Sequence, residues 1–324
     1  MTRVNLITGF LGSGKTTTLL HLLAHKPADE KWAILVNEFG EVGIDGALLA
    51  NRGAELKEIP GGCMCCVNGL PLQVGLNMLL KQARPDRLII EPTGLGHPKQ
   101  LLNMLRAAVY QPWITVDATL TLLDPRQLAD ARVAANENFR DQLTAADIIV
   151  ASKSDRWKPE DRQRLADWQR DNLGDRLLTE TAWGKIDPAL LTHPARHDRP
   201  VPDALHHAHS IRPQGLAALK LEGQARWRRA LNEGQGYASC GWIFDEETQF
   251  DTIPLLEWAR HAPVDRVKGV LRTPDGLVNV NRQGDDLFIE TRPVTPPDSR
   301  IELIHHQPAD WNTLQTSLLK IRLN

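Results

Sequence analysis

The sequence predicts an α/β protein in which a mostly parallel sheet is followed by a smaller α+β domain. Short, continuously apolar runs alternate with helical patterns in the first part of the chain, as in sheets covered on both faces and joined by right-handed crossovers. A glycine-rich turn joins the first such run to the first helix. Composition then changes in a proline- and histidine-containing stretch. We therefore expect a first domain at 1–192, a linker at 193–213 and a second domain at 214–324.

Composition limits the classes of partner. The chain has 324 residues, enough for two cores, with 42% hydrophobic and 24% charged residues. A net charge of -2 gives no general attraction to nucleic acid or to an anionic membrane. We expect no membrane span, because the apolar runs are too short to cross a bilayer, and no signal peptide, because the first expected strand closely follows Met1. We expect a cytoplasmic protein with no nucleic-acid or membrane partner.

The first expected strand, at 4–7, leads into a phosphate-binding motif. Residues 9–16 match G-x-x-x-x-G-K-[ST], in which glycines turn backbone N–H groups inward and the next helix points its positive end at the same place. Lys15 can then reach the β- and γ-phosphates, and the Thr16 hydroxyl can bind Mg²⁺. A chance match in a glycine turn is the alternative, which the strand and helix context disfavours. The nucleotide-binding residues expected here are Gly9, Gly12, Ser13, Gly14, Lys15, Thr16 and Thr17.

The remaining elements of the first domain follow from periodicity and from breakers. Helical patterns are expected at 16–26, 71–81 and 127–145. Strands are expected at 32–36, 55–59, 87–91, 119–123 and 147–150, and those at 32–36, 87–91 and 147–150 are expected to be buried.

Two of these strands end in further nucleotide motifs. Glu91 ends the strand at 87–91, where its carboxylate can join the Mg²⁺ shell, and Gly94 can sense the γ-phosphate. Residues 152–155 are similar to the [NT]-K-x-D signature of GTP-binding proteins. The Asp155 carboxylate would accept from N1–H and the 2-amino group of guanine, which adenine cannot match, while the Lys153 stem covers the base. Such a tetrapeptide also occurs by chance, but its place after a buried strand favours guanine.

Three cysteines lie close together after a pair of glycines. Cys63, Cys65 and Cys66 form C-x-C-C, and thiolates this close can bind one soft or borderline ion, by default Zn²⁺. A four-coordinate site needs another donor, and Glu41 is the candidate because the strand at 32–36 delivers its loop to the phosphate site. A site without a fixed fourth ligand suits loading and release.

Other interpretations of these residues stay open. Cys63 and Cys66 also have dithiol redox spacing, although no thioredoxin-like elements surround them. A structural zinc ribbon would need a second ligand pair, which Cys240 alone cannot supply; inert packing is the remaining alternative. The acidic residues at 38, 41 and 45 also fit a solvated loop.

The second half carries fewer signals of chemistry. Strands are expected at 241–244, 264–272 and 288–290, and a helix at 252–260. Cys240 is expected to be buried beside aromatic residues. Five of the eleven histidines lie in the stretch 193–213, which fits a flexible polar linker better than a weak metal site.

Taken together, these motifs resemble the CobW-type metallochaperone GTPases, relatives of the urease and hydrogenase nickel-insertion GTPases. The resemblance rests on the phosphate-binding motif at 9–16, the acidic segment at 37–41, the cysteine segment at 61–66 and the motifs at 91–94 and 152–155, in this order. It extends into the second half through residues 266–269. Two positions differ from the family pattern. Val36 stands where many members have Glu, so the metal ligands are expected among Glu41, Glu38 and the cysteines. Ser152 stands where the base motif begins with Asn or Thr.

The resemblance implies a P-loop GTPase that uses GTP, Mg²⁺ and Zn²⁺ and couples nucleotide state to zinc delivery to a client metalloprotein. It also implies metal- or nucleotide-dependent self-association. Asp45, by likeness to an acidic switch residue, is expected to orient the attacking water, and turnover should be slow without an arginine finger. Two alternatives remain: a metal storage or sensing protein with nucleotide as a conformational ligand, and an ATP-dependent small-molecule kinase.

Overall fold

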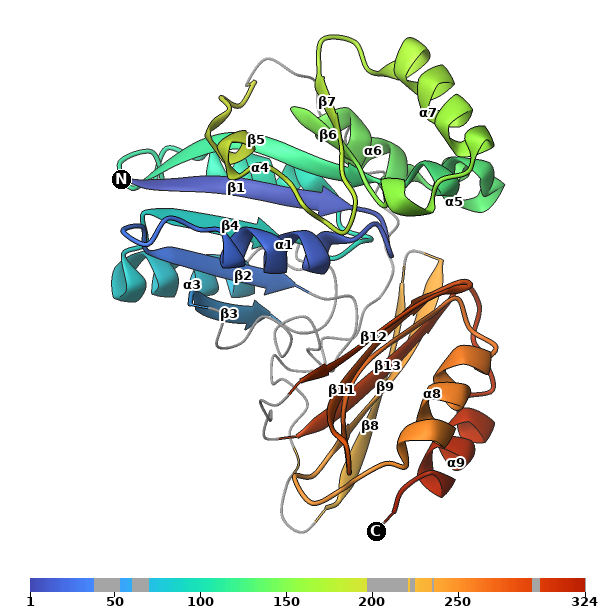
Figure 1. Ribbon diagram of the computed structural model, residues 1–324. Coiled ribbons are helices and arrows are strands. Elements are labelled where there is room, and N and C mark those ends of the chain that lie inside the picture. The colour runs from blue at the N-terminus through green and yellow to red at the C-terminus, as the bar shows by residue number, and fades with distance from the viewer. Residues whose placement is uncertain are drawn as a thin grey trace. The chain divides into compact units, whose positions relative to one another are not determined.

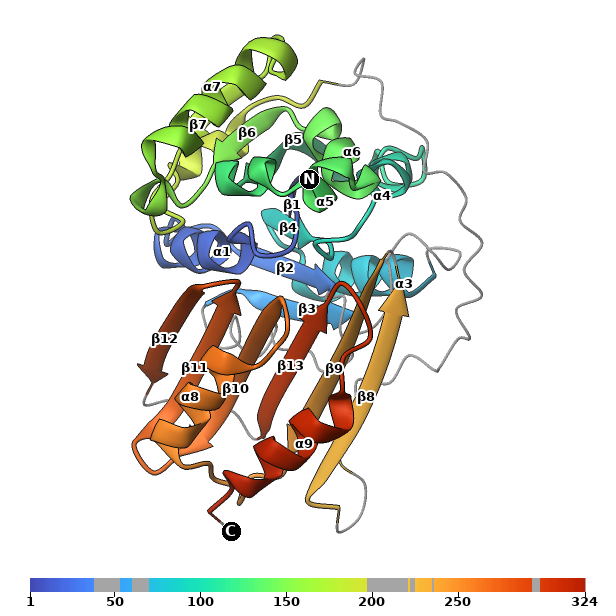
Figure 2. The same ribbon diagram turned by 90° about the vertical axis from the view of Figure 1, so that its right-hand side faces the viewer.

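The computed structural model describes residues 1–37, 53–59, 70–196, 221, 225–234, 236–292 and 298–323. These residues divide into two compact units, the first containing the described residues up to 196 and the second those from 221 onward. Each unit has its own sheet (Figures 1 and 2). The limits given above for the two domains and the linker stay a prediction. No helix in the described part of the chain is long and apolar enough to cross a membrane.

The first unit is built on a seven-stranded parallel sheet in the order β3-β2-β4-β1-β5-β6-β7. Its strands are β1 (Thr2–Gly9), β2 (Trp32–Asn37), β3 (Glu55–Ile59), β4 (Arg87–Glu91), β5 (Ile114–Leu123), β6 (Ile148–Ala151) and β7 (Leu177–Glu180). Because the strands are parallel, the carboxyl ends of β1, β4, β5 and β6 open onto one edge of the sheet. All three nucleotide motifs follow strands that end at this edge.

Helices cover both faces of this sheet (Figure 1). The helical elements are α1 (Lys15–Ala24), α3 (Leu70–Met78), α4 (Pro98–Leu105), α5 (Ala131–Ala135), α6 (Glu137–Ala145), α7 (Pro159–Asn172), the π-helix η1 (Leu79–Ala83), and the 3₁₀ turns η2 (Pro125–Ala129), η3 (Ser154–Arg156) and η4 (Pro188–Thr192). Leu19 and Leu22 of α1 pack on one face with Ile34, whereas Leu101 and Leu105 of α4 pack on the other. Double coverage explains why the inner strands β2, β4 and β6 are fully buried and mostly apolar.

A buried ion cluster lies at the opposite edge, near the start of β1. The Arg87 guanidinium is 4% exposed and lies 3.5 Å from Asp117 Oδ2, while Arg3 Nε donates to the same oxygen at 2.7 Å. Asn5 Nδ2 donates to Ala118 O at 3.1 Å and to Leu191 O at 3.0 Å. Hydrogen bonding to Asp117 raises the pKa of Arg3, whereas burial lowers the pKa of Arg87. The cluster joins β1, β4, β5 and η4.

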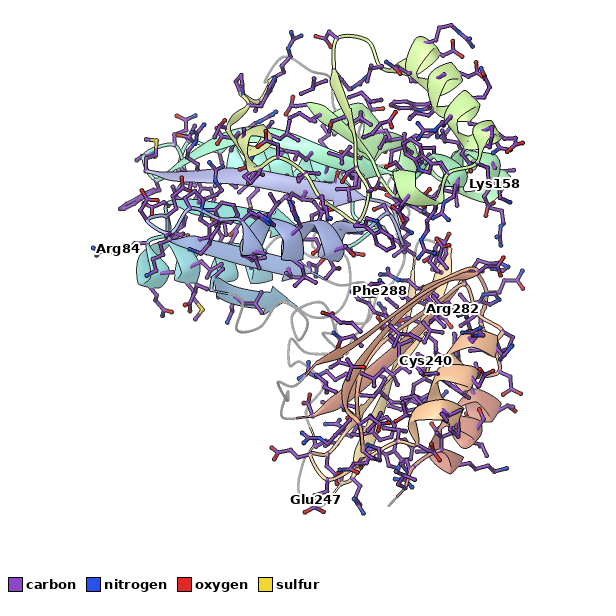
Figure 3. The ribbon with its side chains drawn as sticks, in the orientation of Figure 1. Arg84, Lys158, Cys240, Glu247, Arg282 and Phe288 are labelled. Carbon is purple, nitrogen blue, oxygen red and sulfur yellow. The ribbon has the colours of Figure 1, made fainter. Side chains whose placement is uncertain are left out.

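The second unit is an antiparallel sheet in the order β12-β11-β10-β13-β9-β8, with two helices on one face. Its elements are β8 (Trp227–Gly234), β9 (Tyr237–Phe244), α8 (Thr252–His261), β10 (Arg266–Thr273), β11 (Gly276–Gln283), β12 (Asp286–Arg292), β13 (Ser299–His305) and α9 (Trp311–Lys320). Leu255 of α8 and Leu318 of α9 pack against Trp242 and Leu303 of the sheet. Cys240 is fully buried in this core (Figure 3), as predicted.

The predicted fold class is confirmed, and the differences are local. The helix expected at 127–145 is three pieces, η2, α5 and α6, because Asp130 and Asn136 each cap a new helix start. β5 begins five residues before the expected strand at 119–123. Sequence reasoning missed the elements α4, α7, β7, β8, β11, β13 and α9.

Candidate nucleotide site

The phosphate-binding loop joins β1 to α1 through backbone conformations that glycine alone adopts easily. Gly9, Gly12 and Gly14 have φ angles of 144°, 76° and 102°. A Cβ at Gly9 would lie 2.5 Å from Ser13 Oγ and 2.8 Å from Leu122 O, so the loop turns too tightly for a side chain there. The spacing of the motif is therefore imposed by contact with the loop itself and with β5.

Lys15 and Thr16 begin α1 and are each 8% exposed. Lys15 Nζ donates to Gly9 O at 2.9 Å and to Phe10 O at 3.4 Å, which keeps the ammonium group against the loop. The first turn of α1 carries no acidic side chain, so the positive end of the helix dipole is not neutralised there. This combination of lysine, helix end and loop amides favours an anion.

The turn after β4 packs directly on the phosphate-binding loop. Glu91 ends β4, is 2% exposed and pairs in register with Val36 of β2. A Cβ at Gly94 would lie 2.8 Å from Leu11 N, so only glycine lets the two loops approach this closely. Gln142 of α6 holds the turn, because its Nε2 donates to Gly94 O at 3.0 Å and to Gly96 O at 2.8 Å.

The predicted base motif is tied to the same loop. Ser152 follows β6, and its Oγ donates to Ser13 O at 2.7 Å. Ser152, which replaces the Asn or Thr of the signature, therefore still contacts the phosphate-binding loop. Lys153 has a φ of 60°, and its Nζ lies 3.5 Å from Asp124 Oδ2 at the end of β5. Asp124 follows a strand of the sheet, so its position was a signal that sequence reasoning overlooked.

A fourth segment, 181–187, meets the base motif from the other side. Asp155 Oδ1 accepts a hydrogen bond from Trp183 N–H at 3.3 Å, and Ser154 N–H donates to Thr181 O at 3.0 Å. A Cβ at Gly184 would lie 2.9 Å from Thr18 N, so this segment also packs on α1. Trp183 is 54% exposed beside Asp155, where an aromatic ring could cover a bound base.

The structure thus gathers the described predicted residues at one edge of the sheet. These are Gly9, Gly12, Ser13, Gly14, Lys15, Thr16, Thr17, Glu91, Gly94, Lys153 and Asp155. The expected switch residue Asp45 and the expected zinc ligands Cys63, Cys65, Cys66 and Glu41 lie outside the described residues. Sequence reasoning missed the supporting residues Gln142 and Asp124, together with Gln127, whose Nε2 donates to Leu11 O at 2.7 Å.

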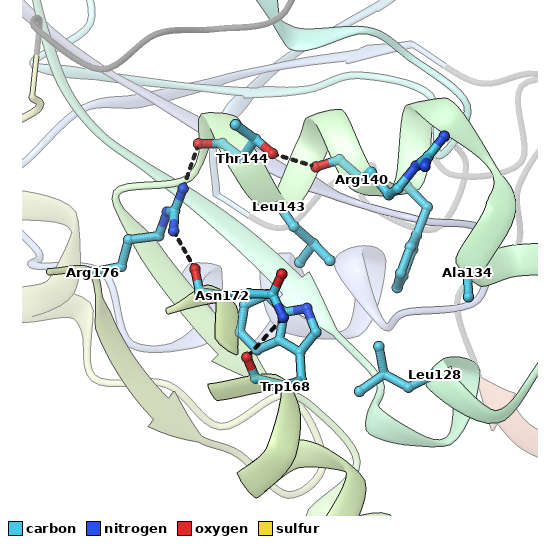
Figure 4. A pocket seen from close by; sticks show the side chains of 9 residues that line it. Leu128, Ala134, Arg140, Leu143, Thr144, Trp168, Asn172 and Arg176 are labelled. Carbon is cyan, nitrogen blue, oxygen red and sulfur yellow. Dashed lines mark hydrogen bonds between the residues drawn. The ribbon is translucent and has the colours of Figure 1, made fainter. Parts of the chain in front are cut away.

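A separate cavity of about 340 Å³ lies among η2, α5, α6 and α7 (Figure 4). Its two arginines are already used in the fold. Arg176 Nη1 donates to Asn172 O at 2.7 Å and Nη2 donates to Thr144 O at 3.0 Å, while Arg140 Nη2 donates to Ala135 O at 3.4 Å. None of the predicted site residues lines this cavity. We assign it no role in nucleotide binding.

Comparisons with known proteins assign the chain to a family. The family model described as CobW/HypB/UreG, nucleotide-binding domain, matches residues 3–176. Zinc chaperone YeiR of Escherichia coli (strain K12) is 67% identical over 324 residues, covering 100% of this chain and 99% of that protein. Zinc chaperone CobW of Sinorhizobium sp is 34% identical over 177 residues, covering 46% of this chain and 50% of that protein.

Among solved structures, Zn(II)-bound YjiA GTPase from E. coli aligns over 99% of both chains, with a TM-score of 0.46 and 21% identity. HypB from Helicobacter pylori in complex with nickel covers 59% of this chain and 82% of its own, with a TM-score of 0.41 and 21% identity. The family match and the full-length relative decide the assignment: the chain belongs to the CobW/HypB/UreG family.

Proposed function

We propose that this chain is a Mg²⁺-dependent GTPase that binds zinc and couples its nucleotide state to zinc delivery. The observation that carries the proposal is the meeting of three nucleotide motifs at one sheet edge, held by the hydrogen bond from Ser152 Oγ to Ser13 O. Family membership and the full-length likeness to a zinc chaperone support the zinc part of the proposal.

The phosphate site works by positioning and charge neutralisation. Lys15 and the loop amides hold the β- and γ-phosphates, and the Gly94 turn meets the terminal phosphate. The Thr16 hydroxyl and the buried Glu91 carboxylate are hard oxygen donors of the kind that Mg²⁺ prefers, so these residues fit the ion. Bound there, Mg²⁺ would neutralise charge on the phosphates; Asp45 is the proposed residue for orienting the attacking water.

Guanine is selected by the segment that follows β6. Asp155 offers a carboxylate to the two N–H groups of guanine, and Lys153 covers one face of the base with its aliphatic stem. The hydrogen bond from Trp183 N–H to Asp155 Oδ1 fixes the carboxylate before nucleotide arrives, so less ordering is needed on binding.

Zinc is the cargo of this cycle. Cys63, Cys65 and Cys66 are the proposed thiolate ligands, and Glu41 is the proposed fourth donor. Glu41 lies in the segment that follows β2, so a change at the terminal phosphate could be transmitted to a zinc ligand. We propose an unidentified client metalloprotein as receiver, a cytoplasmic location, and self-association that depends on metal or nucleotide.

Base choice is tested by exchanging donor and acceptor chemistry at Asp155. Asp155→Asn replaces an acceptor oxygen by an amide donor, which suits xanthine, with a carbonyl at C2, better than guanine. We expect GTP affinity to fall at least a hundredfold and xanthosine triphosphate to become the better ligand. Asp171→Asn, an exposed matched control, should leave affinity unchanged. Preference of the wild-type chain for ATP would instead indicate a kinase.

Coupling is tested by measuring GTP hydrolysis with and without stoichiometric zinc. We expect zinc to change kcat or the GTP affinity of the wild-type chain but not of a chain carrying Cys63→Ala, Cys65→Ala and Cys66→Ala. By linkage, GTP must alter zinc affinity by the same factor as zinc alters GTP affinity. Identical kinetics with and without zinc would refute coupling, and tight zinc binding without phosphate release would point to storage or sensing.

A further inference from the structure

We propose that Asp265, His305 and His306 form a second zinc site, contained entirely in the second unit. They offer one carboxylate oxygen and two imidazole nitrogens, and these ligand atoms all lie within 4.8 Å of one another. Imidazole and carboxylate are the nitrogen and oxygen donors that zinc takes in proteins. The site shares no residue with the cysteine cluster, so it can be tested independently of the proposed function.

The sheet register brings these residues together. β10 and β13 are antiparallel neighbours in which Arg266 pairs with Ile304. In an antiparallel pair the residue before Arg266 lies opposite the residue after Ile304, so Asp265 lies opposite His305. Adjacent side chains on a straight strand point to opposite faces. The chain bends at His306, immediately after β13 ends, and this lets both imidazoles reach the same carboxylate.

Both imidazole rings point their Nδ1 atom at Asp265 Oδ2. His306 Nδ1 lies 2.8 Å and His305 Nδ1 3.2 Å from Asp265 Oδ2, and the ring centroids are 4.2 Å apart. Zinc–ligand bonds of about 2.0–2.2 Å place tetrahedral ligands roughly 3.3 Å apart. A single ion therefore fits these donors after small side-chain adjustments.

A purely hydrogen-bonded cluster explains only half of this arrangement. His306 donates to Asp265 Oδ2 through its backbone N–H at 2.8 Å, and its Nδ1 is within hydrogen-bond distance of the same oxygen. His305 Nδ1, however, is buried and makes no hydrogen bond to any described residue, in spite of its closeness to the carboxylate. The contact of this nitrogen with Asp265 Oδ2 has an ion-pair distance but not the geometry of a hydrogen bond, and a shared ion would use the nitrogen as a ligand.

The backbone around Asp265 is held in place before any ligand binds. Gly284 N–H donates to Asp265 O at 2.9 Å. Arg282, labelled in Figure 3, donates through Nη2 to Ala262 O and Val264 O, each at 2.8 Å. Its positive charge also lies near Asp265 and opposes a cation, but the guanidinium is occupied by these carbonyls. Three protein ligands with partly exposed side chains leave a coordination position for water, which favours an exchangeable ion.

The test uses the full chain carrying Cys63→Ala, Cys65→Ala and Cys66→Ala, which removes the thiolates at the other proposed site. Zinc is titrated against a competing fluorescent chelator, and Co²⁺ is then added as a spectroscopic substitute. We expect one remaining site and visible cobalt bands without thiolate charge transfer. Adding His305→Asn or Asp265→Asn should raise the zinc Kd at least tenfold and abolish the bands.

The matched control is His261→Asn, since His261 forms an exposed pair with Glu257 in the same unit and should not affect zinc binding. Asp265→Asn keeps a side-chain oxygen for the His306 N–H, and circular dichroism checks that each variant is folded. If the thiolate-free chain binds neither zinc nor cobalt, or if His305→Asn binds them as tightly as its parent, the site does not exist. Zinc-dependent GTP hydrolysis by the wild-type chain is a separate readout, so failure of one proposal leaves the other standing.

Discussion

At the scale of single residues, the contact between Ser152 and the phosphate-binding loop can be tested directly. Ser152→Ala removes the donor to Ser13 O, and both residues are buried. Leaving that carbonyl without its donor should cost about 1–3 kcal/mol of folding free energy and weaken GDP binding several-fold. Urea unfolding and titration calorimetry measure the two effects.

Ser152→Thr is the matching rescue, because it keeps the hydroxyl. Thr144→Ala is the control, since the Thr144 hydroxyl donates to Arg140 O within its own helix and not to the phosphate-binding loop. Unchanged stability and affinity in Ser152→Ala would mean that this hydrogen bond does not join the base motif to the loop.

Cys240 offers a second residue-scale prediction, about reactivity. Burial raises the pKa of its thiol to about 12, and the side chain is fully buried. Because only the thiolate attacks disulfide reagents, Cys240 should not react in the folded chain at pH 8. In the variant without Cys63, Cys65 and Cys66, a thiol assay should find no reactive group until urea is added, and one thereafter. Rapid reaction of the folded variant would contradict the burial described here.

The same scale shows where sequence reasoning about the site stops. The shared location of Lys15, Glu91 and Asp155 could be predicted, because each belongs to a short motif with fixed spacing that ends or follows a strand. Gln142 was not, since its hydrogen bonds to Gly94 and Gly96 join segments far apart in the chain. A glutamine in an amphipathic helix looks like any other polar residue until the fold places it against a turn.

At the scale of elements, the ion cluster that joins β1, β4, β5 and η4 should be a main source of stability. Asp117→Ala would leave Arg87 in a buried position where, among the described residues, Glu30 at 3.9 Å is the remaining paired carboxylate. Breaking a buried pair in this way costs about 3–5 kcal/mol, because the remaining charge keeps its desolvation penalty.

Urea unfolding of Asp117→Ala measures this cost, and Asp171→Ala is the control. Asp171 pairs with Arg170 on an exposed surface, where water screens the two charges, so its removal should leave the stability unchanged. A loss below about 1 kcal/mol for Asp117→Ala would show that Arg87 is stabilised by its other contacts, through Asn5 and Leu191.

Strands could be predicted from the sequence where both of their faces are buried. β2 and β4 were placed to within a residue because their continuous apolar runs have clear ends. β3 was placed as well, although it is an edge strand with three charged residues. β7 was missed: it is four residues long, lies at the sheet edge and is only partly buried. The antiparallel strands β8, β11 and β13 were missed as well, since their polar and apolar residues mix and their pairing partners are distant in sequence.

At the scale of the whole molecule, each unit closes its own core. The two clusters on the faces of the parallel sheet contain residues of the first unit alone, whereas the cluster around Trp242 contains residues of the second alone. Neither sheet includes a strand of the other unit. We therefore expect separable stability, because the described apolar core of each unit is made of that unit's own residues.

A fragment of residues 1–196 should accordingly fold alone and bind GTP. We expect a single cooperative thermal transition by circular dichroism and a GTP affinity within about threefold of the full chain, since the described nucleotide residues all lie in this fragment. Lys15→Ala in the same fragment is the control: it should fold but lose nucleotide binding. A fragment that unfolds without a cooperative transition would show that the second unit supplies contacts needed for folding. A folded fragment that fails to bind GTP would instead show that the nucleotide site is completed by residues beyond 196.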